Sequence, residues 1–337
     1  MSAYFGTHFI KIMKFSVLDT TNPHYNLAVE EYLFNTSDEE VFLLWQNSKT
    51  VVIGKNQNAF AEINKPVLDE KGIFLARRIT GGGAVYHDEG NVNYSFITPV
   101  AKTEGIDFSY YATPIVNALK SLGVAVSLSG RNDLVTDSGK KVSGNAQHRI
   151  QNRVLHHGTL LFSSDLEVLS SVLNVDEEKL KSKAVKSTRS RVENISSLID
   201  KKMDVDEFIA FLSSFIISTY HPEIISVEEN PEILKIYERN KSIGWLYPEK
   251  PMLSNYQKTI KKRFDFGTVE LQLSLKNDLI EKVSISGDFF GEKDVSYLEN
   301  LLSGTSLTNL KSTLENVFVG DCVSGMTNDD FVSLFNL

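Results

Sequence analysis

The sequence predicts a protein of the α+β class. Strand-like and helical segments are mixed along the chain without regular β–α–β alternation. Strand-like runs dominate up to residue 162, and helical patterns dominate after residue 164. Near residues 244–255, one glycine and two prolines interrupt the apolar periodicity. We therefore expect two domains, residues 1–246 and residues 254–337.

The first predicted elements are a strand at Ile12–Leu18 and a helix that begins after Asn22. Asn22 can cap this helix, and Pro23 fits its first position because the missing N–H costs nothing there. Another helix is predicted at Phe108–Leu122 and is stopped by Gly123. Further strands are predicted at Val41–Trp45, Thr50–Ile53, Ile73–Ala76, Asn91–Thr98, Val124–Leu128 and Val154–Phe162.

Turn chemistry predicts two hairpins. Residues 137–139 (Asp-Ser-Gly) separate Asp133–Thr136 from Lys140–Ser143, and Asn277-Asp278 separates the alternating runs Val269–Leu275 and Leu279–Ser286. The later helices are predicted at Asp204–Thr219, Asp294–Leu302 and Ser306–Val317, the first opened by a capping box of Asp204 and Glu207. The C-terminal part should therefore be a small α+β domain.

Composition excludes several classes of protein. The formal charge is −8, from 35 basic and 43 acidic side chains, which argues against a nucleic-acid groove because phosphate contacts need excess Lys and Arg. No apolar stretch approaches the roughly 20 residues that span a bilayer. The N-terminus is too polar for a signal peptide, and one cysteine, Cys322, fits a reducing compartment. We expect a cytoplasmic protein that binds neither nucleic acid nor membrane.

The segment from Arg77 to Asp88 contains three consecutive glycines, Gly81–Gly83, followed by the apolar Ala84–Tyr86. Without Cβ atoms, this backbone can approach a bulky ligand with its N–H groups. Arg78 beside it can pair with a carboxylate or phosphate. A glycine triplet alone is weak evidence, since a mobile loop between strands has the same composition.

A second segment runs from Asn132-Asp133 to Lys140-Lys141 and on to residues 142–147, Val-Ser-Gly-Asn-Ala-Gln. Neighbouring strand residues point to opposite faces, so only one of the two lysines can face a site. For Lys140 we prefer the interpretation of a solvated hairpin flank.

The same argument applies to His156 and His157. A zinc site is disfavoured because no cysteine or third histidine lies nearby at ligand spacing. We expect one of the two to line a site and the other to be structural.

A third segment carries six basic residues within thirteen positions and no acidic residue. A solvated helical face is the usual explanation of such a run, whereas in an acidic protein it is also a natural place for a polyphosphate to bind. These residues are Lys179, Lys181, Lys183, Lys186, Arg189 and Arg191.

Taken together and in this order, these motifs resemble the lipoate–protein ligase family. The resemblance spans most of residues 15–250, and residues 251–337 are similar to the small C-terminal domain of many such ligases. It implies a catalytic domain like those of biotin ligases and class II aminoacyl-tRNA synthetases, with mixed, largely antiparallel sheets and flanking helices.

The resemblance also implies the activity. Lipoate attacks the α-phosphate of ATP to give lipoyl-AMP and pyrophosphate, and a carrier lysine then takes the lipoyl group. The implied partners are lipoate and the apo lipoyl domains of 2-oxoacid dehydrogenase complexes, the glycine-cleavage carrier protein, or both.

By resemblance, Lys141 is the fixed cation that stabilises charge on the α-phosphate. Asp133 is the candidate ligand of the Mg²⁺ that accompanies ATP. The implied ATP and lipoyl-AMP site comprises Arg78, Gly81, Gly82, Gly83, Ala84, Val85, Tyr86, Asn132, Asp133, Lys141, Gly144, Ala146, His157, Thr159, Lys183 and Arg191. The implied lipoate site comprises Arg78, Thr80, Lys141 and His148.

The chain departs from the family at His148, where an arginine is frequent. A neutral imidazole is a weaker anion partner, so this change bears on the choice of acyl substrate or on the affinity for it. Arg149 or Arg153 is a candidate to compensate for the missing arginine.

Three alternatives stay open. An octanoyltransferase of the same superfamily needs a site thiolate, and the only cysteine is Cys322 in the C-terminal part. A biotin ligase is less favoured because its glycine-rich segment differs. A non-catalytic binder of lipoylated carriers is disfavoured by Lys141 together with the full glycine segment.

Overall fold

A computed structural model describes residues 13–100, 107–130, 132–172, 192–248 and 256–335. The largest sheet has eight strands in the order β11-β1-β2-β6-β10-β9-β8-β7. Strand β1, next to the edge strand β11, pairs in parallel with β2 and β11, and the other neighbours are antiparallel. Its strands are β1 (Lys14–Val17), β2 (Val41–Trp45), β6 (Asn91–Pro99), β7 (Val126–Ser129), β8 (Asp133–Thr136), β9 (Lys141–Ile150), β10 (Arg153–Leu161) and β11 (Glu223–Ile224).

A second sheet, in the order β4-β3-β5, lies on the side of α1 (Pro23–Thr36). Its strands are β3 (Thr50–Ile53), β4 (Phe74–Arg77) and β5 (Val85–His87). One apolar core joins α1 to both sheets through Leu27, Phe34 and their neighbours. This packing places the glycine segment, which links β4 to β5, beside the large sheet.

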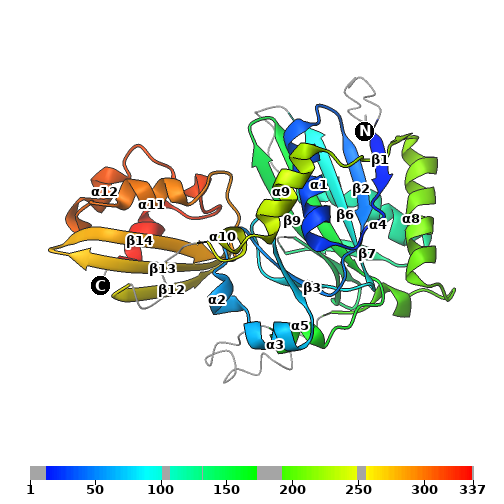
Figure 1. Ribbon diagram of the computed structural model, residues 1–337, viewed down its shortest axis with the longest axis horizontal. Helices are drawn as coiled ribbons and strands as arrows, with labels where there is room; N and C mark the ends of the chain where they lie inside the picture. Colours follow the sequence, from blue (N-terminus) through cyan, green and yellow to red (C-terminus); the bar gives the residue numbers. More distant parts are fainter. Residues whose placement is uncertain (1–12, 101–106, 131, 173–191, 249–255, 336–337) are drawn as a thin grey trace.

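The other face of the large sheet is covered by α4 (Phe108–Ser121) and α8 (Val205–Tyr220) (Figure 1). Phe208 of α8 stacks on Phe162 at 4.4 Å between ring centroids, so this face is solid core. The predicted capping box is present, because the Asp204 carboxylate accepts from Glu207 N–H while Glu207 accepts from Asp204 N–H. The Asn22 cap of α1 is present as well.

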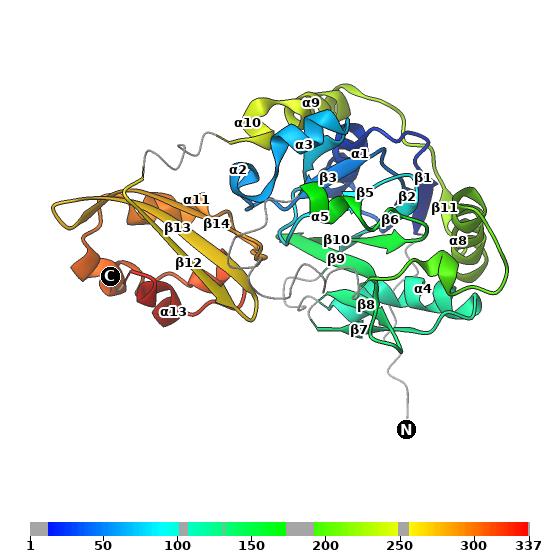
Figure 2. The same ribbon diagram turned by 90° about the horizontal axis from the view of Figure 1, so that it is seen from below.

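The remaining helices of the N-terminal part are α2 (Ala59–Glu62), α3 (Lys65–Glu70), α5 (Val168–Val172), α9 (Pro231–Lys241), which packs on α1, and α10 (Ile243–Leu246). The C-terminal domain lies beside the end that carries α2 and α10 (Figures 1 and 2). It consists of the antiparallel sheet β12-β13-β14 and helices packed on it, with its own apolar core. Its elements are β12 (Lys258–Phe264), β13 (Gly267–Lys276), β14 (Leu279–Gly287), α11 (Ser296–Leu302), α12 (Leu310–Thr313) and α13 (Asn328–Ser333).

The predicted α+β class, with largely antiparallel sheets, is confirmed, and several elements differ in detail. The helix expected at Ser306–Val317 is wrong as one element: a 3₁₀ turn at Leu307–Asn309 leads into the four-residue α12. The Asn328 amide donates to the carbonyls of Leu314 and Val317, which a continuing helix would need. The sequence does not predict strand β12, because four of its seven residues are lysine or arginine and only Ile260 and Phe264 are apolar. These two side chains pack on the core.

Candidate active site

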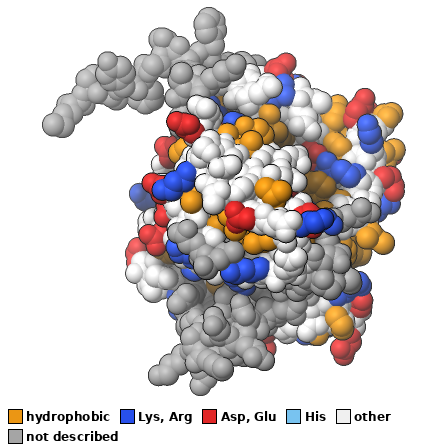
Figure 3. All heavy atoms as spheres, turned by 90° about the vertical axis from the view of Figure 1, so that its left-hand side faces the viewer, with side chains coloured by type: hydrophobic (Ala, Val, Ile, Leu, Met, Phe, Trp, Pro, Cys, Tyr) orange, Lys and Arg blue, Asp and Glu red, His pale blue; other side chains and the backbone are white. Residues whose placement is uncertain are grey.

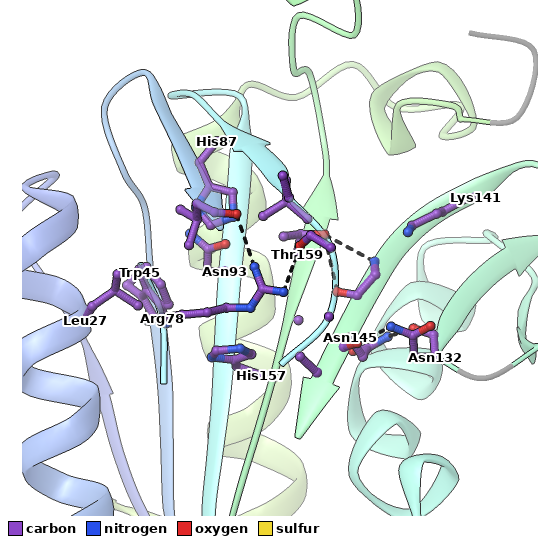
Figure 4. Close-up of a pocket in the computed structure, with 18 residues that line it drawn as sticks. Leu27, Trp45, Arg78, His87, Asn93, Asn132, Lys141, Asn145, His157 and Thr159 are labelled. Atoms are coloured by element: carbon purple, nitrogen blue, oxygen red, sulfur yellow. Dashed lines mark hydrogen bonds between the residues drawn. The ribbon is translucent and has the colours of Figure 1, made fainter. Parts of the chain in front are cut away.

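One pocket opens between the large sheet and the glycine segment (Figure 4). Its walls come from α1, from strands β2, β3, β5, β6, β9 and β10, from the loop after β4 and from Asn132 before β8. Eleven residues implied by the sequence line it: Arg78, Gly82, Gly83, Ala84, Val85, Asn132, Lys141, Gly144, Ala146, His157 and Thr159.

Five implied residues do not line this pocket. Thr80 is buried, Gly81 is buried against Phe289, and Tyr86 is part of an apolar core with Val51 and Ile53. Asp133 lies next to the pocket in an ion pair with Lys141. His148 is buried and its ring lies 5.7 Å from that of Phe34. Lys183 and Arg191, like the rest of the basic segment, lie outside the described residues.

Seven further lining residues were not singled out from the sequence. His87 and Asn145 stand inside motifs that were recognised, so their neighbours were a usable signal. Gly158 likewise stands inside the recognised His-His-Gly-Thr motif. Leu27, Trp45 and Val52 are apolar residues of one helix and two strands, where the sequence resembles plain core. Asn93 is a polar residue within β6 that no motif marks. The seven are Leu27, Trp45, Val52, His87, Asn93, Asn145 and Gly158.

The two adjacent lysines point in different directions, as strand alternation requires. Lys141 lines the pocket, and its ammonium lies 2.8 Å from the Asp133 carboxylate. Lys140 instead pairs with Glu193 at 3.2 Å. Val192, which directly follows the basic segment, forms a β-bridge with Lys141. The chain therefore presents one of these two ammonium groups to the pocket.

The histidine pair divides in the same way. His157 lines the pocket, whereas His156 is fully buried between Tyr94 and Tyr111 and bonds Gln147 through Nδ1 at 2.7 Å. Burial lowers the pKa of His156 to about 3, so it is neutral. His156 is a structural residue.

Arg78 organises the glycine loop from inside. Four of its N–H groups donate within the protein: Nε to Thr80, Nη1 to the Val52 carbonyl, and Nη2 to the carbonyls of Gly81 and Gly83. Burial lowers the pKa of Arg78 to about 10, so it remains a cation at neutral pH. Gly82 has φ +92°, a conformation that favours glycine.

Two buried donors in the lining have no hydrogen-bond partner among the described residues: His87 Nε2 and Asn93 Nδ2. His87 is 4% exposed, and burial lowers the pKa of this histidine to about 3. The Asn47 amide nitrogen lies 3.1 Å from His87 Nδ1, so Nδ1 accepts and Nε2 carries the proton. Because a buried donor is costly when unpaired, the two mark where a ligand acceptor would bind.

The C-terminal domain touches the back of the glycine loop. Gly82 N–H donates to the Phe289 carbonyl at 3.2 Å, and Gly287 N–H donates to the Asn56 carbonyl at 2.9 Å. Lys55 pairs with Asp294 at 2.8 Å. Although burial opposes it, hydrogen bonding to Lys55 and Ser296 lowers the pKa of Asp294 to about 2. The C-terminal domain thus contacts the segment that forms one wall of the pocket.

Other chemistries find less support in the described part of the chain. Cys322 is buried in the C-terminal core, and burial raises the pKa of its thiol to about 11, so it is not a thiolate. No group of three histidine, cysteine or acidic side chains among the described residues could hold a metal ion.

No helix in the described ranges is long and apolar enough to cross a membrane. Basic and acidic side chains are interspersed over the C-terminal domain (Figure 3).

Family models match both parts of the chain. Residues 22–216 match the lipoyl protein ligase A/B catalytic domain, and residues 254–335 match the bacterial lipoate protein ligase C-terminus. The lipoate-protein ligase LplJ of Bacillus subtilis is 40% identical over 323 residues, which cover 93% of this chain and 96% of that protein.

The fold is similar to that of solved structures. LipL1 of P. falciparum in complex with lipoate is 28% identical, with a TM-score of 0.77, and the match covers 96% of this chain and 98% of that one. A lipoate-protein ligase A bound with ATP is 26% identical, with a TM-score of 0.59, and the match covers 70% of this chain and 99% of that one.

Proposed function

Because the chain belongs to the lipoyl protein ligase family, we propose that it activates lipoate with ATP and transfers the lipoyl group to a lysine of a carrier protein. One observation carries this proposal: the ammonium of Lys141 and the glycine loop held by Arg78 line the same pocket. A carboxylate and a nucleotide can be brought together there beside a fixed positive charge. The reaction belongs in the cytoplasm, where ATP is available.

In the first step, a carboxylate oxygen of lipoate attacks the α-phosphorus of ATP, and the bond to the bridging oxygen breaks to release pyrophosphate. Negative charge grows on the phosphate oxygens in the transition state. Lys141 stabilises that charge because its ammonium is preorganised at the pocket edge. Mg²⁺ accompanies the phosphates, and we assign Asp133 as its protein ligand, since Mg²⁺ usually binds one or two carboxylates plus substrate oxygens.

In the second step, the carrier lysine attacks the carbonyl carbon of lipoyl-AMP. A C–N bond forms, the carbonyl–phosphate C–O bond breaks, AMP leaves, and the amine loses a proton. The acyl chain needs an apolar slot, which Leu27, Trp45 and Val52 supply at the pocket wall. The carrier is an apo lipoyl domain of a 2-oxoacid dehydrogenase complex or the glycine-cleavage carrier protein.

Pyrophosphate release by purified protein tests the proposal. We expect release from ATP and Mg²⁺ only when lipoate is added. Absence of lipoate-dependent pyrophosphate, together with acyl transfer from an octanoyl carrier, would instead identify a transferase. In a second assay with each apo carrier, mass spectrometry of the target lysine shows which carrier is modified.

A further inference from the structure

A buried chain of hydrogen bonds connects α1 to the glycine loop. Glu30 on α1 accepts from His157 Nδ1 at 2.9 Å. His157 Nε2 lies 2.9 Å from Thr80 Oγ1, and Thr80 Oγ1 accepts from Arg78 Nε at 2.9 Å. Ser95 also donates to Glu30, at 2.5 Å. Three segments far apart in sequence thus converge on one relay.

With His157 as the neutral imidazole, one set of proton positions satisfies every member of the relay. An arginine Nε–H can only donate, so Thr80 Oγ1 accepts from Arg78 and turns its own proton to His157 Nε2. A carboxylate accepts, so His157 Nδ1 carries the ring proton toward Glu30. Both nitrogens of His157 are therefore occupied, and the imidazole orients its neighbours rather than serving as a free base.

The relay also pairs two buried charges. Glu30 is 1% exposed, Thr80 0%, Arg78 5% and His157 7%. A buried guanidinium is costly unless it is hydrogen-bonded and compensated. The negative charge of Glu30 raises the pKa of Arg78 against the larger effect of burial, so Glu30 acts as its counter-charge. Removing the carboxylate would leave the cation without it.

Arg78 in turn sets the shape of the loop. Its Nη2 donates to the carbonyls of Gly81 and Gly83, at 2.7 and 2.8 Å, on either side of Gly82. Its Nη1 ties the same group to Val52 on β3. A rotated guanidinium would break both contacts with the loop. Because Gly82 and Gly83 line the pocket, this rotation would change the shape of the pocket wall.

We propose that Glu30 is a positioning residue for nucleotide binding, acting through His157 and Thr80 to hold Arg78 in the orientation that shapes the glycine loop. This inference rests on the proposed function, because it takes the loop to be the nucleotide site. Arg78, which itself lines the pocket, then holds the loop in shape, and the backbone of Gly82 and Gly83 meets the ligand.

Two substitutions at Thr80 test the relay. Thr80→Val removes the hydroxyl and leaves Arg78 Nε–H and His157 Nε2 unpaired, whereas Thr80→Ser keeps the relay. We expect the Kd for ATP, measured by calorimetry, to rise about tenfold or more in Thr80→Val. A tenfold rise corresponds to a loss of about 1.4 kcal/mol of binding free energy. In Thr80→Ser it should stay within about twofold. Equal Kd values for wild type and a folded Thr80→Val would overturn the proposal.

A matched pair of neighbouring glutamates covers the case in which Thr80→Val does not fold. Glu30→Gln keeps the shape but removes the charge, and it should raise the Kd for ATP and the KM for ATP more than it lowers kcat at saturating ATP. Glu31→Gln breaks a pair with Arg239 outside the pocket and should leave both values unchanged. If Glu30→Gln and Glu31→Gln had equal effects, Glu30 would only stabilise the fold and the proposal would be overturned.

Failure of the proposed function is a separate outcome. If the wild type released no pyrophosphate, the proposed function would be refuted, whereas the Kd for ATP can be measured without turnover and still tests the relay.

Discussion

The ammonium of Lys141 lies 2.8 Å from a carboxylate oxygen of Asp133, on the neighbouring strand β8. Their side chains are 32% and 36% exposed, so the pair adds little stability, on the order of 0–1 kcal/mol. In the proposed mechanism, Asp133 would hold the Lys141 ammonium at the pocket edge before substrate binds. With Mg²⁺ and ATP bound, the Asp133 carboxylate would serve as a metal ligand and the Lys141 ammonium would face the phosphate.

Replacing Asp133 should therefore change the metal requirement more than the fold. In Asp133→Asn we expect the Mg²⁺ concentration at half-maximal pyrophosphate release to rise about tenfold, because an amide is a weaker ligand than a carboxylate. The melting temperature should barely move, since the ion pair is exposed. A titration with Mg²⁺ at fixed ATP measures this. An unchanged midpoint would remove Asp133 from the metal site.

The three consecutive glycines should differ in their sensitivity to substitution. A Cβ on Gly81 would lie 2.3 Å from the Phe289 carbonyl oxygen, whereas on Gly83 the nearest contact is 4.0 Å from Asp288. We expect Gly81→Ala to disturb the contact with the C-terminal domain and Gly83→Ala to leave it intact. Small-angle scattering of both variants measures the domain arrangement. Indistinguishable profiles for wild type and Gly81→Ala would show that this contact is not formed in solution.

Acid should destabilise the protein before its carboxylates titrate. Burial holds the pKa of His87 and His156 at about 3 and that of His148 at about 4, against about 6.5 when unfolded. The unfolded chain therefore binds protons that the folded chain excludes, and stability is lost as pH falls from about 6.5 toward 4. Each histidine contributes a slope of up to about 1.4 kcal/mol per pH unit.

Urea unfolding at pH 7, 6 and 5 measures this loss. The variant His156→Gln should show a shallower dependence, because its residue 156 no longer titrates in the unfolded state. A free energy of unfolding that is the same at pH 7 and pH 5 would contradict the buried neutral state of these histidines.

Features set by neighbouring residues could be predicted from the sequence. The Asn22 cap, the capping box at Asp204 and the opposite directions of Lys140 and Lys141 each follow from local geometry. The motif residues that line the pocket could be recognised because several short motifs occur together in one order.

Features that depend on contacts between residues distant in sequence could not be predicted from the sequence. Glu30 looks like an ordinary helical glutamate, and only the packing of α1 shows that it meets His157. Gly81 lies against Phe289 of the C-terminal domain, a contact that no local pattern indicates. His148 lies beside Phe34, since its place depends on how β9 meets α1. The assignment of Gly81 to the nucleotide and of His148 to lipoate stays a prediction. The predicted boundary at 1–246 and 254–337 remains a prediction.

Lipoate-dependent exchange of labelled pyrophosphate into ATP, compared between Lys141→Ala and Lys140→Ala, tests the central claim most directly. The two lysines are adjacent, but only Lys141 lines the pocket, while Lys140 pairs with Glu193. Loss of one preorganised charge should slow exchange by about 10²–10³-fold in Lys141→Ala. Lys140→Ala should keep the wild-type rate. Equal exchange by the two variants would contradict the role of Lys141 in forming the acyl-adenylate.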